Sequence, residues 1–264
     1  MIPGSGASTR AVCLARHDVT VVAPVYRNAA TLESLVRRIH DAFDRDGTDH
    51  VVLLVDDGSP DDAWDVIQDI CRRDARVAGA RLDRNYGQHT AILLGLTLAR
   101  SAWTAVMDAD LQDPPEALPA LVAKAHTTRS TVFGIRVARH GHWLRRASSA
   151  TYKLLLTVLA GVPAGCGTFF VVPAEVVETV TRYKVSRPQV LVMTCNASPR
   201  VTTLGYIRNS REIGESAYDF RSLLIAALNG LRCALECRRG FGTSKVHAQS
   251  WAGIGGLAGE PWQP

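Results

Sequence analysis

The segment Val106-Met-Asp-Ala-Asp-Leu-Gln-Asp-Pro-Pro-Glu116 is the most informative stretch of this chain for both its fold and its chemistry. It overlaps an apolar run, Trp103 to Met107, that is typical of a short buried strand. Two carboxylates, Asp108 and Asp110, follow the run at once, and Gln112 comes next on a loop broken by prolines. Ligands bind at the carboxyl edge of open α/β sheets, so we expect a binding site here. Such oxygen ligands suit Mg²⁺ or Mn²⁺ carried in with a diphosphate, whereas the alternative is an ordinary Asp-rich turn.

Outward from this segment, apolar strands alternate with amphipathic helices. We predict strands at 19–24, 51–55, 77–82, 103–107, 131–135, 169–172 and 200–207, and helices at 31–44, 61–73, 88–100, 116–125, 143–159 and 219–235. Thr31 is expected to cap the first helix. This rhythm predicts an α/β domain over residues 19–239, with a mostly parallel central sheet flanked by helices. Residues 1–18 are predicted to be a flexible leader and the Gly-rich residues 240–264 a disordered tail.

Composition limits the class of protein. The chain has 264 residues and a formal net charge of +5, which fits anionic partners such as nucleotides, lipid phosphates or a membrane surface. Its six cysteines form no Cys-x-x-Cys pair, so a structural zinc site is not expected. We expect these cysteines to be reduced thiols in a cytoplasmic protein. The apolar stripe of the 219–235 helix is typical of core packing. The arginines around it leave open an interfacial helix in peripheral contact with the inner face of the membrane.

Polar residues gather where predicted strands end. Pro24 and Tyr26 end the first strand, where an aromatic ring can stack on a base. Asp56 and Asp57 end the second, and such a pair repels itself unless something binds it. Uracil N–H and ribose hydroxyl groups are suitable partners. The alternative is a capping turn, which would explain Ser59 but not the paired carboxylates.

Several basic and small residues could bind phosphate. Arg84 follows a strand, and Gly87 and Gln88 open a helix whose amino terminus suits an anion. Further candidates are Arg136, Arg145, Arg146, Arg211 and Ser216, although a charge run is often only a solvated face. The chain has neither a Gly-x-Gly-x-x-Gly fingerprint nor a P-loop, which argues against dinucleotide dehydrogenases and NTPases.

Together these motifs resemble the family 2 glycosyltransferases of the GT-A fold, and in particular their polyprenyl-phosphate sugar transferases. The resemblance rests on residues 56–59, 84–89, 108–116 and 211–216 and runs from about Val19 to Arg239. It implies that Asp56 and Asp57 contact the nucleotide, with Pro24 and Tyr26 around the base. It also implies that Asp108, Asp110 and Gln112 meet the metal, and that Arg136, Arg145 or Arg146, Arg211 and Ser216 face the acceptor phosphate and the leaving diphosphate.

The resemblance predicts an inverting, metal-dependent transferase that moves a sugar from a nucleoside-diphosphate sugar, with UDP favoured, to a polyprenyl phosphate. No nucleic-acid partner is expected. The chain departs from the family because the Asp of a Gly-Asp-Phe/Tyr segment is replaced around Gly165, and no acid follows the first strand near Ala29. Two alternatives therefore stay open: a soluble or natural-product hydroxyl acceptor, and a nucleotide-sugar-binding protein without turnover.

Overall fold

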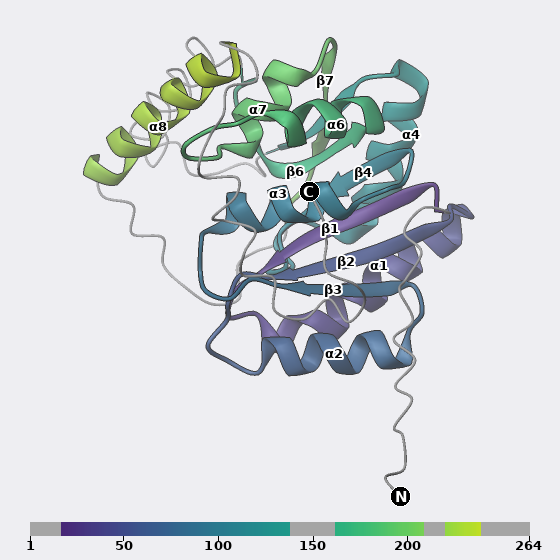
Figure 1. Ribbon diagram of the computed structural model, residues 1–264. Coiled ribbons are helices and arrows are strands. Elements are labelled where there is room, and N and C mark those ends of the chain that lie inside the picture. The colour runs from purple at the N-terminus through teal and green to yellow at the C-terminus, as the bar shows by residue number, and fades with distance from the viewer. Residues whose placement is uncertain (1–16, 138–161, 209–219, 239–264) are drawn as a thin grey trace, which may run out of the picture.

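The computed structural model describes residues 17–137, 162–208 and 220–238, which form a sheet with helices on both faces (Figure 1). The strands are β1 (Val19–Val25), β2 (His50–Asp56), β3 (Val77–Arg81), β4 (Trp103–Val106), β5 (Thr131–Arg136), β6 (Cys166–Pro173) and β7 (Val201–Tyr206). The helices are α1 (Leu32–Asp46), α2 (Ala63–Arg73), α3 (Gln88–Leu98), α4 (Leu118–Thr128), α6 (Ala174–Arg182), α7 (Val190–Ala197) and α8 (Phe220–Arg238). Two 3₁₀ turns, η2 (Ala29–Thr31) and η3 (Pro115–Ala117), lead into α1 and α4.

The sheet places the ends of most strands along one edge. Its order is β3-β2-β1-β4-β6-β5-β7. The β1–β2, β2–β3, β1–β4 and β5–β7 pairs are parallel, whereas β6 runs antiparallel to both β4 and β5. Every strand except β6 therefore ends at the same edge, and β6 begins there. This arrangement confirms the predicted α/β class with a mostly parallel sheet.

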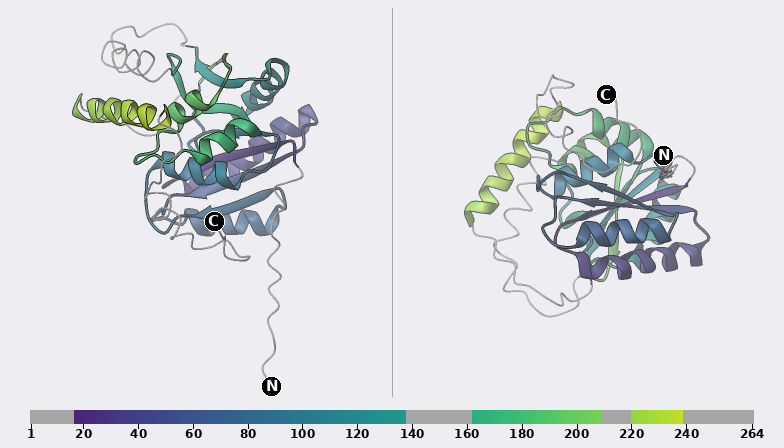
Figure 2. Two further views of the ribbon diagram at one scale, coloured as in Figure 1. Left: turned by 45° about the horizontal axis from the view of Figure 1, so that its top comes forward. Right: turned by 60° about the horizontal axis from the view of Figure 1, so that its bottom comes forward.

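Two layers of helices bury the sheet (Figure 2). One core cluster packs side chains of α1, α2 and α4 against one face of the sheet, and the other packs α3, α6 and α7 against the opposite face. All seven residues of β1 and of β2 are buried, as expected for strands covered on both faces. The C-terminal part of α8 packs against α7.

The predicted strands and helices that fall on described residues are confirmed, with ends that differ by a few residues. Helices α6 and α7 were not predicted, and the predicted helix 143–159 lies outside the described residues. Thr31 is the N-cap residue of α1, as predicted, but its side chain makes no capping hydrogen bond. Instead its hydroxyl donates to the carbonyl oxygens of Asn28 (2.9 Å) and Ala109 (2.8 Å), which ties the loop after β1 to the loop after β4.

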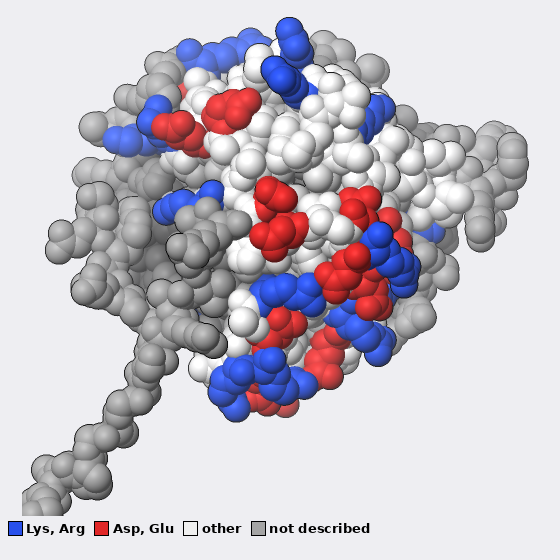
Figure 3. Space-filling view, turned by 90° about the vertical axis from the view of Figure 1, so that its right-hand side faces the viewer, with Lys and Arg blue, Asp and Glu red and all other residues white. Residues whose placement is uncertain are grey.

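Charged side chains of both signs are interspersed on the face shown in Figure 3, and no single sign dominates it. Several ion pairs join neighbouring elements: Arg38 pairs with Glu116 at 2.8 Å, Arg73 with Glu33 at 2.6 Å and Arg76 with Asp44 at 2.7 Å. These are exposed or half-exposed pairs, so each contributes little to stability. Among the described helices, none combines the length and the apolar character that crossing a membrane requires.

Candidate active site

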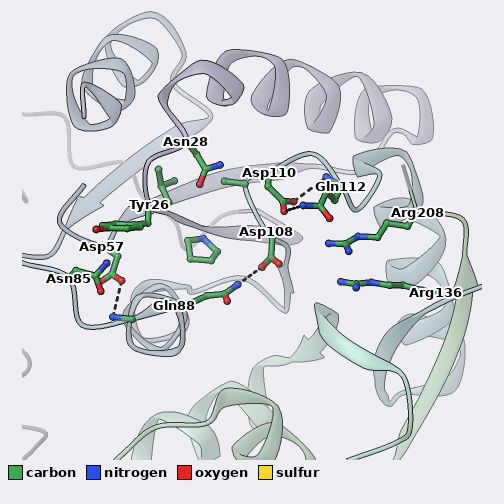
Figure 4. Close-up of a pocket in the computed structure, with 14 residues that line it drawn as sticks. Tyr26, Asn28, Asp57, Asn85, Gln88, Asp108, Asp110, Gln112, Arg136 and Arg208 are labelled. Carbon is green, nitrogen blue, oxygen red and sulfur yellow. Dashed lines mark hydrogen bonds between the residues drawn. The ribbon is translucent and has the colours of Figure 1, made fainter. Parts of the chain in front are cut away.

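A cavity of about 540 Å³ opens at the edge where the parallel strands end. Its lining has three chemically distinct parts (Figure 4). Tyr26, Asp57 and Asn85 lie at one end, Asp108, Asp110 and Gln112 lie in the middle, and Arg136 and Arg208 lie at the other end. The rest of the lining consists of Pro24, Val25, Asn28, Gly87, Gln88 and Ala109. The loops after β1, β2, β3, β4, β5 and β7 thus all reach one cavity.

The two carboxylates after β2 play different roles. Asp57 lines the cavity, and its two oxygens accept the backbone N–H groups of Tyr86 and Gly87, both at 2.8 Å. Burial nevertheless raises the pKa of Asp57. Asp56 is fully buried and does not line the cavity. It accepts the N–H of Ser59 at 3.0 Å and pairs with Arg81 at 3.1 Å. The positive charge of Arg81 thus offsets the repulsion between the two carboxylates, and the hydrogen bond to Ser59 stabilises the turn after β2.

Of the predicted anion-binding residues Arg84, Gly87 and Gln88, the last two line the cavity. The N–H of Gly87, at the start of α3, is already bound by Asp57, so a protein carboxylate occupies that helix terminus. Arg84 does not line the cavity, and its guanidinium lies 4.8 Å from the centre of the Tyr86 ring. Asn85, which the sequence did not single out, lines the cavity instead.

Asp108 sits in the middle of the cavity and is held from two sides. Gln88 on α3 and Thr168 on β6 both donate to its Oδ1 atom, Thr168 at 2.7 Å. Burial raises the pKa of Asp108 to about 6; the Thr168 hydrogen bond opposes this rise, and the nearby Asp113 and Asp110 add to it. A cation beside this carboxylate would relieve the unfavourable burial of its charge.

A strained turn fixes the orientation of the Asp110 carboxylate. Leu111 has a φ of 57°, in the left-handed region that non-glycine residues rarely adopt. This conformation lets Gln112 fold back, so that its backbone N–H donates to Asp110 Oδ1 at 3.1 Å and its side-chain amide donates to Oδ2. Arg27, in the loop after β1, also has a φ of 57°. Backbone strain of this kind clusters at functional sites.

The middle of the cavity offers oxygen ligands suited to a hard divalent cation. Its two carboxylates, Asp108 and Asp110, line the same cavity together with Gln112. In the part of the chain that the structure describes, no three His, Cys, Asp or Glu side chains are grouped to hold a metal by themselves. This donor set therefore fits Mg²⁺ or Mn²⁺ only if a ligand supplies further oxygens, as a diphosphate does.

Two arginines form the far end of the cavity. Arg136 ends β5 and Arg208 follows β7, and these two strands are parallel neighbours. The Nε group of Arg136 donates to the hydroxyl of Tyr206 at 3.3 Å, and that hydroxyl donates to Asp113. Figure 4 shows both guanidinium groups pointing toward Asp108 and Gln112. The structure thus brings Arg136 to the site as expected and adds Arg208, which the sequence did not single out.

The remaining predicted site residues, Arg145, Arg146, Arg211 and Ser216, lie outside the described residues. Thr168 and Arg208 were missed because their roles come from contacts between distant segments: Thr168 lies 60 residues from Asp108. For Arg208, its place directly after an apolar stretch at a strand end was the signal that could have found it.

The model of the family described as "Glycosyl transferase family 2" matches residues 20–181, more than half of the chain. The chain belongs to the family 2 glycosyltransferases. The match includes the ends of β1 to β5 and therefore every described part of the cavity except Arg208. The family resemblance predicted from the sequence is confirmed.

Two relatives and a solved structure extend this result. This glycosyltransferase is 37% identical over 150 residues to undecaprenyl-phosphate 4-deoxy-4-formamido-L-arabinose transferase of Enterobacter sp. (strain 638), a match that covers 56% of this chain and 46% of that enzyme. The chain thus spans less than half of that relative. It is 26% identical over 245 residues to the uncharacterized glycosyltransferase YkcC of Bacillus subtilis (strain 168), covering 91% of this chain and 74% of YkcC.

The solved structure is glucosyl-3-phosphoglycerate synthase from Mycobacterium tuberculosis in complex with Mn²⁺, UDP and glucosyl-3-phosphoglycerate. It aligns with a TM-score of 0.57 and 17% identity, and the alignment covers 92% of this chain and 88% of that one. At this identity the likeness shows a shared fold, and it confirms the GT-A architecture of this family 2 glycosyltransferase.

Proposed function

We propose that this glycosyltransferase moves a sugar from a UDP-sugar to a polyprenyl phosphate, with inversion at the anomeric carbon. The observation that carries the proposal is the order of groups along one cavity: an aromatic and amide end, a carboxylate centre and an arginine end. A nucleoside diphosphate sugar with its phosphate acceptor has a matching order: the base, the metal-bound diphosphate, and the distal and acceptor phosphates.

The end that holds Tyr26 is proposed to bind the nucleoside. The Tyr26 ring is 39% exposed, which leaves a face on which a base can stack. Asp57 and Asn85 beside it offer a hydrogen-bond acceptor and an amide for the base or ribose. The bound UDP of the mycobacterial synthase supports a uridine nucleotide as the donor of this chain as well.

The carboxylate centre is proposed to hold a divalent cation between Asp108, Asp110 and Gln112. Bound there, Mg²⁺ or Mn²⁺ would neutralise the negative charge that builds up on the leaving diphosphate. Gln88 and Thr168 fix the orientation of Asp108, and the strained turn at Leu111 fixes Asp110. The Mn²⁺ of the mycobacterial synthase supports this assignment.

The arginine end is proposed to receive the phosphate of the acceptor and the distal phosphate of the donor. An oxygen of the acceptor phosphate attacks the anomeric carbon, and the bond from that carbon to the diphosphate breaks with its electron pair leaving on the nucleotide. Attack opposite the leaving group inverts the configuration. An ionised phosphate monoester needs no strong general base, which fits a chain that has Gly165 where the family resemblance predicts an acid. The name of the Enterobacter relative supports a polyprenyl phosphate as the acceptor.

The test is a screen of nucleotide sugars for thermal stabilisation of the full chain with and without Mn²⁺, since a bound ligand raises the melting temperature. Transfer is then measured with polyprenyl phosphate in detergent and with soluble hydroxyl acceptors. Metal-dependent stabilisation by a UDP-sugar and transfer to the lipid phosphate are expected. Transfer only to a hydroxyl acceptor would contradict the lipid acceptor, and binding without transfer or hydrolysis would contradict catalysis.

A further inference from the structure

The two arginines at the end of the cavity share one partner, the carboxylate of Asp113. The Nε atom of Arg208 lies 3.2 Å from Asp113 Oδ1, and that of Arg136 lies 3.8 Å from the same oxygen. Tyr206 donates its hydroxyl hydrogen to this oxygen and accepts the Nε–H of Arg136. A single oxygen atom therefore connects the strand ends of β5 and β7 with the loop after β4.

Like Asp108, whose described hydrogen bonds come only from the side chains of Gln88 and Thr168, Asp113 differs from three other acids at this edge. Asp56, Asp57 and Asp110 each accept at least one backbone N–H group and so shape a loop. The contacts of Asp113 within the described residues are all with side chains at the arginine end. Its role is therefore not explained by the turn in which it lies.

The burial of Asp113 also needs an explanation. The residue is 1% exposed, and its Oδ2 atom is buried without a hydrogen-bond partner in the described part of the chain. Such an arrangement costs stability, and buried polar groups of this kind often serve a function. The two guanidinium groups carry two positive charges and Asp113 carries one negative charge. The three side chains together therefore have a net positive charge, which can attract an anion.

Among the described residues, the contacts with Asp113 leave the outer part of each arginine available. Both ion pairs with Asp113 run through Nε, the nitrogen nearest the main chain. The terminal nitrogens of the two guanidinium groups point toward Asp108 and Gln112 in Figure 4. Without Asp113, the two positive groups would repel each other across neighbouring strand ends.

We infer that Asp113 is a positioning residue that holds Arg136 and Arg208 side by side as one binding unit for a phosphate group. Tyr206 is the neutral spacer of this unit. The inference rests on the proposed function, since the phosphate is either the distal phosphate of the donor nucleotide or the phosphate of the acceptor. It assigns a role to Asp113, which is not one of the proposed metal ligands, and to Arg208.

The test is a double-mutant cycle with Asp113→Asn, Arg208→Gln and the combined variant of the full chain. Asparagine keeps the shape of the side chain and removes its charge. Glu116→Gln is the matched control. Glu116 lies on the same segment as Asp113, and its exposed carboxylate also pairs with an arginine, Arg38. Calorimetry in the presence of Mn²⁺ measures the affinity for UMP and UDP and, in parallel, for GMP and GDP. A second titration measures the affinity for inorganic phosphate while the tightest-binding nucleotide is bound.

If the pair holds the distal phosphate, each single variant lowers the preference for the diphosphate over the monophosphate at least fivefold and changes monophosphate affinity less than twofold. If it holds the acceptor phosphate, the fivefold loss is in phosphate affinity instead. In either case the combined variant is expected to lose less than the product of the two single losses. Glu116→Gln is expected to match the wild type.

The inference would be overturned if the affinity loss of the combined variant equalled the product of the two single losses. It would also be overturned if monophosphate affinity fell as much as diphosphate affinity, or if neither diphosphate nor phosphate affinity changed. A merely structural role would lower the melting temperature and all affinities together. If the wild type binds no nucleotide, the proposed function fails. The affinity of the nucleotide-free variants for inorganic phosphate then decides the inference by itself.

Discussion

At the scale of single residues, the cavity depends on carboxylates that the protein holds in fixed orientations. Asp110 illustrates this, because the backbone and side chain of Gln112 both bind it across a left-handed residue, Leu111. Holding one non-glycine residue in that region costs on the order of 1 kcal/mol. A strained turn of this kind is retained when the orientation of its side chains matters for function.

Asp110→Asn should separate the role of Asp110 in metal binding from its role in the turn. Asparagine can still accept the N–H of Gln112, so the melting temperature should change little. The loss of negative charge should remove the Mn²⁺ dependence of UDP binding and lower transfer at least a hundredfold. Titration of UDP with and without Mn²⁺ measures this effect, with Glu116→Gln as the control. A variant that keeps its metal-dependent affinity would contradict the metal assignment.

At the scale of elements, the loop 84–87 reaches the cavity because Gly58 lets it pass close by. A Cβ atom on Gly58 would lie 2.4 Å from the carbonyl carbon of Arg84 and 2.8 Å from the nitrogen of Asn85. Gly58 also has a φ of 62°, which disfavours other residues. The turn after β2 and the loop after β3 are therefore fitted to each other.

Gly58→Ala should displace this loop and lower the affinity for a uridine nucleotide at least tenfold. Gly47→Ala is a matched control, because Gly47 also has a positive φ, 71°, but a Cβ there meets nothing within 4 Å. The control should lose only about 1 kcal/mol of stability and keep its nucleotide affinity. Unfolding by urea and calorimetry measure the two quantities. Equal losses of affinity in both variants would refute the role of the close packing.

The contact between α3 and α7 should make stability depend on pH. His89 accepts the backbone N–H of Val190 at 3.4 Å, and burial lowers the pKa of His89 to about 4. Because its pKa is near 6.5 in the unfolded chain, unfolding takes up a proton between pH 6.5 and 4, and stability is lost as the pH falls through this range.

The variant His89→Gln keeps an acceptor without a titrating group. Between pH 7.5 and 5.0 the wild type should lose about 2 kcal/mol more stability than this variant, as urea unfolding measures it. His40 and His50 also have pKa values lowered by burial, and they contribute equally to both proteins. Identical slopes in the two proteins would show that His89 is not held in its neutral form.

The elements that the sequence predicted best are those with a clear period or a continuous apolar run, such as α1 and β2. Helix α7 was missed because its sequence, VLVMTCNA, is short and mostly apolar, so no helical period separates it from a buried strand. Helix α6 was missed because it follows β6 directly at Pro173, without a loop to mark its start. In both cases packing against α3 and the sheet, which a local pattern does not contain, selects the helix.

For the site, the sequence predicted the carboxylates that lie at strand ends, since topology alone brings them to one edge. It did not predict that Asp56 would turn inward to Arg81 while Asp57 faces the cavity, because neighbouring residues of an extended chain point in opposite directions and the sequence does not say which one. It could not predict Arg208 beside Arg136 either. That pairing depends on β7 lying next to β5, across 70 residues of chain.

At the scale of the whole molecule, a lipid acceptor requires the cavity to reach a membrane surface. Helix α8 carries two exposed leucines, Leu228 (58% exposed) and Leu235 (46% exposed), seven residues apart and thus on one side of the helix. Arg232 lies between them and pairs with Glu236 at 2.9 Å, and the whole chain has a net charge of +5. Exposed apolar residues beside basic ones are typical of helices that lie on acidic membranes. We therefore propose that α8 makes peripheral contact with the membrane.

The double variant Leu228→Gln/Leu235→Gln should sediment with vesicles of acidic phospholipid several-fold less than the wild type, because it loses apolar contact but no charge. Its transfer to polyprenyl phosphate in vesicles should fall in parallel, whereas transfer to a short soluble prenyl phosphate should stay unchanged. Ala120→Gln, at an exposed position of α4, is the control and should behave as the wild type. Since added salt screens only the charges, a wild-type protein that leaves the vesicles completely in moderate salt would show that the leucines do not hold it there. Equal loss of transfer to both acceptors would instead mean that α8 supports the cavity and not the membrane contact.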